Sequence, residues 1–427
     1  MTYAEPWPAP LAQHPVDAVV TLPGSKSVTN RALVLGALAS GTTVVRHPLR
    51  SRDTELMVAG LGVLGVDISD ERRDWIVTGA PGALVPRDLL VDVGNAGTVA
   101  RFLPALAALA TGPVTFDGDA RMRDRPMGAL LAALRELGVT LDAHDGALPL
   151  TVHGRGRVRG GSVTVDASTS SQLVSGLLLA GPRFDQGLDL RHAGPPMPSA
   201  PHVEMTVAMM RDFGATVRTD EPGRWVVDPG AYAARAVVVE PDLSGAAPFL
   251  AAAVATGGRV RMPGWPTDTT QPGALLLGLL ERMGAQCTVD AEGLTVVGPD
   301  RLDGLDADLS DCGELTPTLA VLAALATTPS RLHGVAHLRG QETDRLAALA
   351  RELSARGATV RELPDGLEIA PAQLHGGLMH TYADHRLAMA AALLGLAVPD
   401  VAVEDVATTA KTMPDFVERW LELVSTQ

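Results

Sequence analysis

The sequence predicts an α/β fold in which one structural unit occurs six times and the six units form two domains of three. A polar segment followed by an apolar run recurs at intervals of about 70 residues, with starts at Gly24, Gly94, Ala167, Asp242, Asp311 and Tyr382. The chain has 427 residues, which is more than one hydrophobic core usually holds and suits two.

Each predicted unit begins with a helix that is apolar on every side and is therefore expected to be buried. Residues 102–110, for example, read FLPALAALA, and residues 387–397 read LAMAAALLGLA. A short alternating strand follows, as at 42–47 or 258–263. In most units an amphipathic helix comes next and ends at a Gly, which favours the left-handed conformation of a helix C-cap; these helices are expected at 126–138, 202–214, 272–284 and 344–357. A β-branched strand then closes the unit.

Composition narrows the class of protein. Hydrophobic residues make up 46% of the chain and charged residues 20%, which is typical of a folded globular protein. The net charge of −14 argues against broad nucleic-acid binding, which needs a basic face. Two cysteines form neither a disulfide framework nor a zinc motif. No apolar run is long enough to span a membrane, and the N-terminus lacks a signal peptide, so we expect a cytoplasmic protein.

The polar segments stand at the N-termini of the buried helices, where backbone N–H groups and the helix dipole favour anions. Three such ends in each domain predict two anion-binding surfaces, which would form a cleft if they faced each other. Lys26, Ser27 and Arg31 fit this interpretation, because a planar guanidinium and an ammonium at one helix start suit a phosphate. Ordinary capping with incidental surface cations is the alternative.

Further polar segments repeat this combination of cations and hydroxyls. They are GNAGTVAR at 94–101, RMRDRP at 121–126, STSSQ at 168–172, QETDR at 341–345, YADHR at 382–386 and TTAKTMPD at 408–415. If 121–126 is an alternating stretch, Arg121, Arg123 and Arg125 all face the same way. Any one segment also suits a solvated surface; their recurrence at matching places favours a site.

Two carboxylates, Glu314 and Glu342, stand at helix starts whose other charges are positive, which makes them candidates for proton transfer. Cys312 has no His or Asn nearby in the sequence and is expected to be a packed core thiol. Among eleven histidines, only His385 lies within a repeated polar segment.

These motifs, from PGSKSVTNRALVLGALA at 23–39 to TTAKTMPDF at 408–416, resemble those of the 5-enolpyruvylshikimate-3-phosphate (EPSP) synthases. The resemblance covers about residues 20–420 in family order. It implies the enolpyruvyl transferase fold: two domains, each of three βαβαββ units, comprising residues 23–240 and residues 1–22 plus 241–427, with the active site in the interdomain cleft. It also implies a monomer that needs neither a metal nor an organic cofactor.

The implied reaction moves the enolpyruvyl group of phosphoenolpyruvate to the 5-hydroxyl of 3-phosphoshikimate and releases phosphate, a step of aromatic amino acid biosynthesis. The resemblance assigns 3-phosphoshikimate to Lys26, Ser27, Arg31, Ser170, Ser171, Gln172, Ser199, Glu314 and Gln341. It assigns phosphoenolpyruvate to Lys26, Asn95, Gly97, Arg125, Gln172, Arg345, His385, Arg386 and Lys411. Glu314 would accept the 5-hydroxyl proton, Glu342 would donate a proton to C3, and Lys26 would complete the catalytic set.

The chain departs from the usual family pattern at Glu314, where Asp is common, at Gln341, where Lys is common, at His202, often Tyr, and at Phe102, often Pro. Two alternatives stand beside the main interpretation. A UDP-N-acetylglucosamine enolpyruvyl transferase has the same fold but carries a reactive Cys in its N-terminal half, and residues 1–286 here contain none. A non-catalytic binding protein of the same fold is the other alternative, and Gln341 is the residue that favours it.

Overall fold

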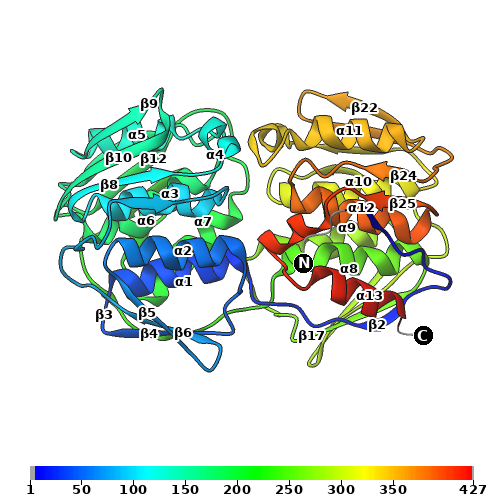
Figure 1. Cartoon of the computed structure of the whole chain (residues 1–427), viewed down its shortest axis with the longest axis horizontal. Helices are drawn as coiled ribbons and strands as arrows, with labels where there is room; N and C mark the ends of the chain where they lie inside the picture. The colour runs from blue at the N-terminus through cyan, green and yellow to red at the C-terminus, as the bar shows by residue number, and fades with distance from the viewer. Residues whose placement is uncertain (1–4, 426–427) are drawn as a thin grey trace. The chain divides into compact units, whose positions relative to one another are not determined.

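The structure is a computed structural model that describes residues 5–425. The chain folds into two compact units (Figure 1). Unit 1 comprises Met1–Pro23 and Pro241–Gln427, and unit 2 comprises Gly24–Glu240. Each unit has one hydrophobic core, built mainly from Ala, Leu and Val.

Unit 2 contains three four-stranded sheets of identical topology. In each sheet the first two strands are parallel and the remaining neighbours are antiparallel. The first sheet consists, in spatial order, of β16 (Ala236–Val238), β4 (Thr42–Arg46), β6 (Asp74–Thr78) and β5 (Asp67–Glu71). The second consists of β7 (Leu90–Asp92), β8 (Thr111–Asp117), β10 (Ala147–Arg155) and β9 (Thr140–His144). The third consists of β11 (Gly161–Val165), β12 (Leu188–His192), β14 (Arg224–Val227) and β13 (Val217–Arg218). A short parallel pair joins β3 (Ala39–Ser40) to β15 (Tyr232–Ala233).

Unit 1 repeats this topology twice and shortens it once. Its four-stranded sheets are β2 (Asp17–Val19), β17 (Arg259–Pro263), β19 (Gly293–Val297) and β18 (Gln286–Asp290); β20 (Asp306–Asp308), β21 (Ser330–His333), β23 (Gly366–Ala370) and β22 (Thr359–Leu363). The third sheet pairs β24 (Gly377–Met379) in parallel with β25 (Val401–Val403). Its third strand is the N-terminal β1 (Trp7–Pro8), which takes the place of a hairpin.

The six apolar helices predicted from the sequence are present and buried. They are α1 (Lys26–Leu38), α3 (Gly97–Ala107) and α6 (Gln172–Ala180) in unit 2, and α8 (Leu243–Thr256), α10 (Thr316–Leu325) and α12 (His385–Ala397) in unit 1. Nearly every residue beyond the first turn of each is inaccessible to solvent, as a helix without a polar face requires. The short helices η3 (Gly313–Leu315) and η1 (Gly181–Arg183) extend α10 and α6.

The predicted amphipathic helices are also present. They are α5 (Gly128–Glu136), α7 (Pro201–Asp212), α9 (Leu276–Arg282, preceded by η2, Pro272–Leu275) and α11 (Arg345–Ala355). The remaining two of the six sequence repeats contain α2 (Arg52–Val63) and α13 (Phe416–Ser425). The glycines expected at their ends have φ values of 94°, 90°, 102° and 92° at Gly138, Gly214, Gly284 and Gly357. The prediction of left-handed C-caps is therefore confirmed.

Two strands next to the crossings of the chain pair in a different sequence repeat from the one that they adjoin in the chain, so that the two repeats exchange a strand. β2 precedes α1, yet it pairs with β17 of unit 1 through residues such as Val19 and Arg261 (Figure 1). In return β16, at the end of unit 2, pairs with β4 and supplies the parallel strand that β2 would otherwise provide. Both exchanged strands lie at the positions where the chain crosses, after Pro23 and after Glu240.

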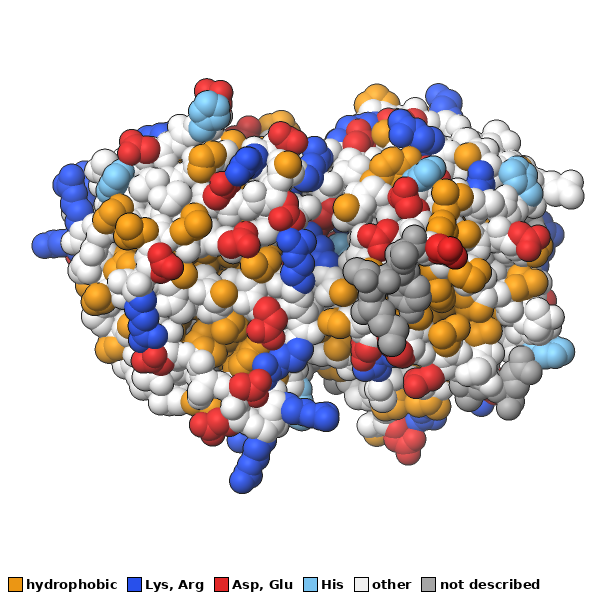
Figure 2. Space-filling model, viewed as in Figure 1, with side chains coloured by type: hydrophobic (Ala, Val, Ile, Leu, Met, Phe, Trp, Pro, Cys, Tyr) orange, Lys and Arg blue, Asp and Glu red, His pale blue; other side chains and the backbone are white. Residues whose placement is uncertain are grey.

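Charges of both signs are interspersed on the face of the molecule shown in Figure 2. Within residues 5–425 no helix is long and apolar enough to cross a membrane.

Helices α3 and α6 approach so closely that Gly176 has no room for a side chain. A Cβ at this position would lie 2.1 Å from the carbonyl oxygen of Arg101. Such an overlap involves rigid backbone on both helices, so it can be relieved only by separating them.

We predict that Gly176→Ala lowers the free energy of unfolding by about 1–3 kcal/mol, because overpacking a helix contact forces backbone shifts. Gly62→Ala in α2 is the matched control, since nothing lies within 4 Å of a Cβ there. The control should be neutral or stabilising, because Ala favours helix by up to about 1 kcal/mol over Gly. Urea unfolding of both variants measures the difference, and equal stabilities would contradict the prediction.

Candidate functional site

The first cationic segment lies at the start of α1. Ser25 is the N-cap, and its hydroxyl accepts a 3.5 Å hydrogen bond from the N–H of Val28. Lys26 Nζ forms a 3.1 Å ion pair with Asp53 Oδ2 on α2, and the Asp53 side chain is only 3% exposed. Reasoning from the sequence missed Asp53, because it gave no reason to pair a residue of the second helix with Lys26.

Arg31 lies one turn further into α1 and is almost completely buried. Its Nε donates to Thr206 Oγ1 at 2.7 Å and its Nη2 to the carbonyl of His202 at 2.9 Å. The carbonyl of Ser27 at 3.0 Å and Ser175 Oγ at 3.4 Å accept the remaining bonds.

None of these acceptors carries a charge. Burial lowers the pKa of Arg31 to about 9, which still leaves the guanidinium protonated at neutral pH. The guanidinium also lies 5.4 Å from the centroid of the Phe102 ring. Arg31 is thus a buried cation held in place by dipoles and an aromatic face, without a carboxylate among these partners. Such a cation favours an anionic ligand.

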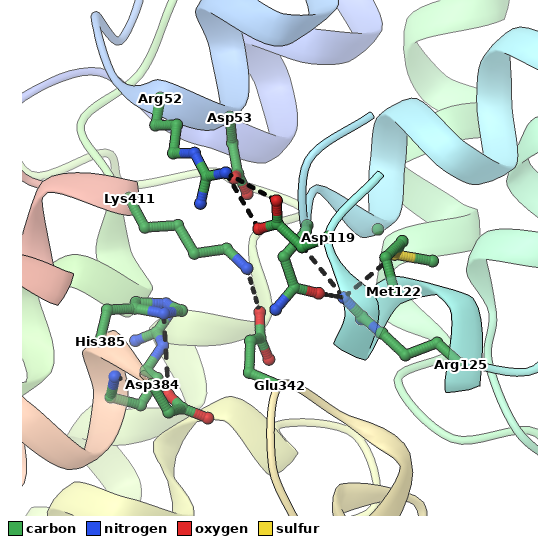
Figure 3. A network of polar contacts seen from close by, with 12 residues as sticks. Arg52, Asp53, Asp119, Met122, Arg125, Glu342, Asp384, His385 and Lys411 are labelled. Atoms are coloured by element: carbon green, nitrogen blue, oxygen red, sulfur yellow. Dashed lines mark hydrogen bonds and ion pairs between the residues drawn. The ribbon is translucent and has the colours of Figure 1, made fainter. Parts of the chain in front are cut away.

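Three of the predicted segments meet at Gly97, the first residue of α3. A Cβ there would lie 2.9 Å from Arg125 Nη2, 2.9 Å from Gln172 Oε1 and 3.0 Å from Arg101 Nη1. The absence of a side chain therefore lets GNAGTVAR, RMRDRP and STSSQ converge. Arg125 Nη1 is fixed by the Asn95 side-chain oxygen at 3.1 Å and also lies 3.8 Å from Met122 Sδ (Figure 3).

The expectation that Arg121, Arg123 and Arg125 face the same way is wrong. Residues Ala120–Asp124 form a short helix, α4, instead of an alternating strand. Arg123 pairs with Asp117 at 2.6 Å and is half exposed, whereas Arg125 is 4% exposed. Arg125 is buried where Arg123 is not, because the chain leaves the helix and becomes extended at Arg125, with a ψ of 136°.

The hydroxyl segment caps α6. Ser170 Oγ accepts a 3.3 Å hydrogen bond from the N–H of Gln172, and Ser171 is the N-cap. Ser199 stands just before α7 with a φ of 54°, a left-handed conformation that is uncommon for serine. Ser175 and Thr206, which hold Arg31, were missed because single hydroxyls inside apolar helices give little signal in a sequence.

In unit 1, Glu342 lies between two cations. Lys411, at the end of η5 (Val406–Lys411), points toward Glu342 in Figure 3, and its Nζ is 2.7 Å from Glu342 Oε1. Arg345 Nη2 is 2.9 Å from Oε2. All three side chains are at most 8% exposed. Because solvent hardly reaches these side chains, it screens the attraction between Glu342 and the two cations only weakly.

Asp384 is the fully buried partner of Arg345 and was missed by the sequence analysis. Its carboxylate accepts bonds of 2.8 and 3.2 Å from Arg345, and it caps α12 by accepting from the N–H of Arg386 at 2.9 Å. Burial opposes the charge on Arg345, but Asp384 and Glu342 outweigh it and raise the pKa of Arg345. His385 Nδ1 lies 3.7 Å from Asp384 Oδ1 (Figure 3).

Ser244, in the first turn of α8, joins two predicted site residues. Its carbonyl accepts a 2.8 Å hydrogen bond from Arg386, and its hydroxyl donates to Glu314 Oε1 at 3.0 Å. The predicted base and one predicted cation are therefore fixed to the same residue.

His337, in η4 (Ala336–Gly340), lies against the backbone next to Glu314. Its Nε2 would be 2.5 Å from a Cβ on Gly313. Burial lowers the pKa of His337 to about 4, although the charge of Glu314 acts in the opposite direction. Gln341 follows η4 as its C-cap.

Cys312 is buried, and burial raises the pKa of its thiol to about 12, so it is a packed core thiol as predicted. Within residues 5–425, no group of three His, Cys, Asp or Glu side chains could hold a metal ion.

We predict that His337 makes the protein sensitive to acid. The unfolded chain binds a proton at His337 near pH 6.5, whereas the folded protein does so only near pH 4. Stability is therefore lost as the pH falls through this interval, by up to about 3 kcal/mol. His337→Gln should remove that part of the loss in urea unfolding at pH 6.5 and 4.5. His375→Gln, at an exposed histidine, should keep the wild-type dependence, and identical profiles for the two variants would contradict the prediction.

Comparisons with known proteins agree with these features. A model of the EPSP synthase (3-phosphoshikimate 1-carboxyvinyltransferase) family matches residues 11–420. The chain is 54% identical to the 3-phosphoshikimate 1-carboxyvinyltransferase of Kocuria rhizophila, with 99% of this chain and 97% of that protein covered.

Solved structures give the same result. EPSP synthase from Acinetobacter baumannii superimposes with a TM-score of 0.81 at 26% identity, covering 98% of this chain and 97% of that one. The enolpyruvyl transferase NikO from Streptomyces tendae, with a TM-score of 0.78 and the same coverage, is 20% identical and shows the fold alone. Fold, motifs and relatives thus lead to one conclusion: the chain belongs to the EPSP synthase family.

Proposed function

We propose that the residues described above perform the reaction of this family in the roles that the motifs imply. The reaction transfers the enolpyruvyl group of phosphoenolpyruvate to the 5-hydroxyl of 3-phosphoshikimate and releases phosphate. Both substrates are polyanions, and the observation that carries the proposal is Arg31, a buried cation whose described partners are all neutral.

The phosphoshikimate set is built around Arg31 in unit 2. Four of the five N–H groups of the guanidinium are bound within unit 2, so Arg31 can donate its remaining Nη1–H to an anionic oxygen. Lys26 and the hydroxyls at the start of α6 supply further donors. The proposed contacts are Lys26, Ser27, Arg31, Ser170, Ser171, Gln172 and Ser199, with Glu314 and Gln341 from unit 1.

The phosphoenolpyruvate set contains three further buried cations. Arg125 and Arg345 are each 4% exposed and Lys411 is 7% exposed, so their charges act in surroundings of low dielectric constant. Fixed cations of this kind stabilise the negative charge that develops as phosphate leaves. The proposed contacts are Lys26, Asn95, Gly97, Arg125, Gln172, Arg345, His385, Arg386 and Lys411.

Two carboxylates serve the proton transfers. Glu342 donates a proton to C3 of phosphoenolpyruvate, C2 becomes cation-like, and the 5-hydroxyl adds to C2 while Glu314 takes its proton. Glu342, now ionised, then takes a proton back from C3, which expels phosphate and restores the double bond. Phosphoenolpyruvate would compete with Glu342 for Lys411 and Arg345, so binding of the anion favours the protonated carboxyl.

Action as a monomer in the cytoplasm is part of the same proposal. Size-exclusion chromatography with light scattering tests the first point, and cell fractionation tests the second.

Phosphate release tests the reaction itself. The purified chain should release phosphate from phosphoenolpyruvate with 3-phosphoshikimate as acceptor and not with UDP-N-acetylglucosamine. In this assay Arg31→Met should raise KM for 3-phosphoshikimate about 10- to 100-fold, the contribution of hydrogen bonds to a charged group. KM for phosphoenolpyruvate should change much less.

Arg183→Met is the matched control for Arg31. Arg183 is a partly buried arginine of unit 2 that donates to the carbonyls of Leu38, Ala80, Pro81 and Gly82. Its loss should lower stability and leave both KM values unchanged. An unaltered KM for 3-phosphoshikimate in Arg31→Met would show that Arg31 serves the fold alone.

We predict that Glu342→Gln lowers kcat about 100- to 10,000-fold, the range that a positioned acid or base contributes. The amide has almost the same shape but cannot deliver a proton, so KM for phosphoenolpyruvate should change less than kcat. Glu368→Gln, at a carboxylate that pairs with Arg361 on the surface of unit 1, should retain full activity. Glu342→Gln with wild-type kcat would remove Glu342 from the mechanism.

A further inference from the structure

The 380–384 loop, which joins β24 to α12, contains two consecutive residues in an unfavourable backbone conformation. Tyr382 and Ala383 both have a φ of 53°, and neither is Gly, Asn or Asp. A side chain in this left-handed region costs about 1–2 kcal/mol for each residue. The loop therefore has to be held by the structure around it.

Two carboxylates hold the 380–384 loop from different elements. Glu352 of α11 is 3% exposed, and it accepts the N–H of His380 at 3.0 Å and the hydroxyl of Tyr382 at 2.6 Å. Glu404, which follows β25, accepts the N–H of Thr381 at 2.9 Å and Nδ1–H of His380 at 2.9 Å. Each carboxylate uses both of its oxygens, so the loop is fixed at four points.

The loop leads directly to the cations of the proposed site. Its last residue, Asp384, pairs with Arg345 and caps the helix that carries Arg386. Arg345 and Glu352 lie two turns apart on α11, and residues at this spacing share one face of a helix. Helix α11 therefore holds the loop at both ends, through Arg345 on Asp384 and through Glu352 on His380 and Tyr382.

We propose that Glu352 and Tyr382 are positioning residues, which together with Glu404 hold the left-handed 380–384 loop and thereby fix Arg345 and Arg386 for phosphoenolpyruvate. The inference rests on the proposed function, because it assumes that these two arginines bind phosphoenolpyruvate. It adds residues that touch neither substrate and act through Asp384.

Tyr382→Phe tests this inference with little change in shape. It deletes the hydroxyl, which donates to Glu352 at 2.6 Å and accepts from Arg351 at 3.4 Å, and it keeps the ring, which lies 5.9 Å from the Arg351 guanidinium. We expect KM for phosphoenolpyruvate to rise about 10-fold, since the lost hydrogen bond is made to a charged group. KM for 3-phosphoshikimate should stay within about twofold, because its set contains neither Arg345 nor Arg386.

Tyr232→Phe is the matched control. Its hydroxyl also makes a buried hydrogen bond, to the carbonyl of Leu179 at 3.0 Å, but in the core of unit 2. This variant should keep both KM values even where it loses stability. Equal effects of the two variants on phosphoenolpyruvate binding would reduce Tyr382 to a general contribution to folding and overturn the inference.

Ala383→Gly tests the role of the strained backbone. Ala383 is exposed, and glycine adopts positive φ without the steric cost. If the contacts of Glu352 and Tyr382 serve to hold that conformation, Ala383→Gly should recover part of the lost phosphoenolpyruvate affinity when combined with Tyr382→Phe. A double variant no better than Tyr382→Phe would overturn the inference.

Hydrogen exchange separates failure of this inference from failure of the proposed function. The amides of His380 and Thr381 should exchange faster in Tyr382→Phe than in the wild type, whether or not phosphate is released. Unchanged exchange overturns the inference even in an active enzyme. Faster exchange with an unchanged KM for phosphoenolpyruvate overturns it as well. A wild-type protein that releases no phosphate with 3-phosphoshikimate refutes the proposed function instead.

Discussion

The structure depends on the burial of six helices that are apolar on every side. Such helices are stable only when other elements surround them, and here sheets and amphipathic helices do so in each unit. Their later turns have no place for charged side chains. Charged and amide groups are therefore confined to the first two turns, where Asn30, Arg31 and Arg101 lie, and to the loops that lead into the helices. The same constraint that builds the two cores thus concentrates Lys26, Gln172 and Arg386 at helix starts.

The two units treat buried charge differently. In unit 2, Arg31 is satisfied by hydroxyl and carbonyl oxygens, which stabilise the cation without neutralising it. In unit 1, Arg345 and Lys411 are paired with Glu342 and Asp384. The first arrangement suits a ligand that stays anionic throughout the reaction. The second suits chemistry in which a carboxylate must exchange its partner, because an incoming phosphate can replace Glu342 beside the cations.

Local sequence patterns made the fold predictable, but they revealed only some of the residues that contact the predicted site residues. The buried helices, the amphipathic helices and the left-handed glycines each leave a signature within one short segment. Asp53, Ser244 and Glu352 leave none, because each acts on a residue far away in the sequence. Residues 121–125 misled for a related reason: alternating arginines suggest a strand, but a single helical turn followed by an extended residue separates Arg123 from Arg125. Asp384 was within reach, since an Asp directly before an apolar helix is a typical N-cap.

The exchange of β2 and β16 has a consequence for the order in which the chain can fold. Residues 24–240 form unit 2 from one continuous stretch, so this unit can be completed while the ribosome is still making the rest. Strand β2 must wait for β17, some 240 residues later, before it has a partner. Unit 1 is therefore complete only when β1 and β2, at the start of the chain, have paired with β25 and β17, which are made after unit 2. A circularly permuted gene that begins after Glu240 and joins the old ends would turn both units into uninterrupted stretches and leave one crossing between them.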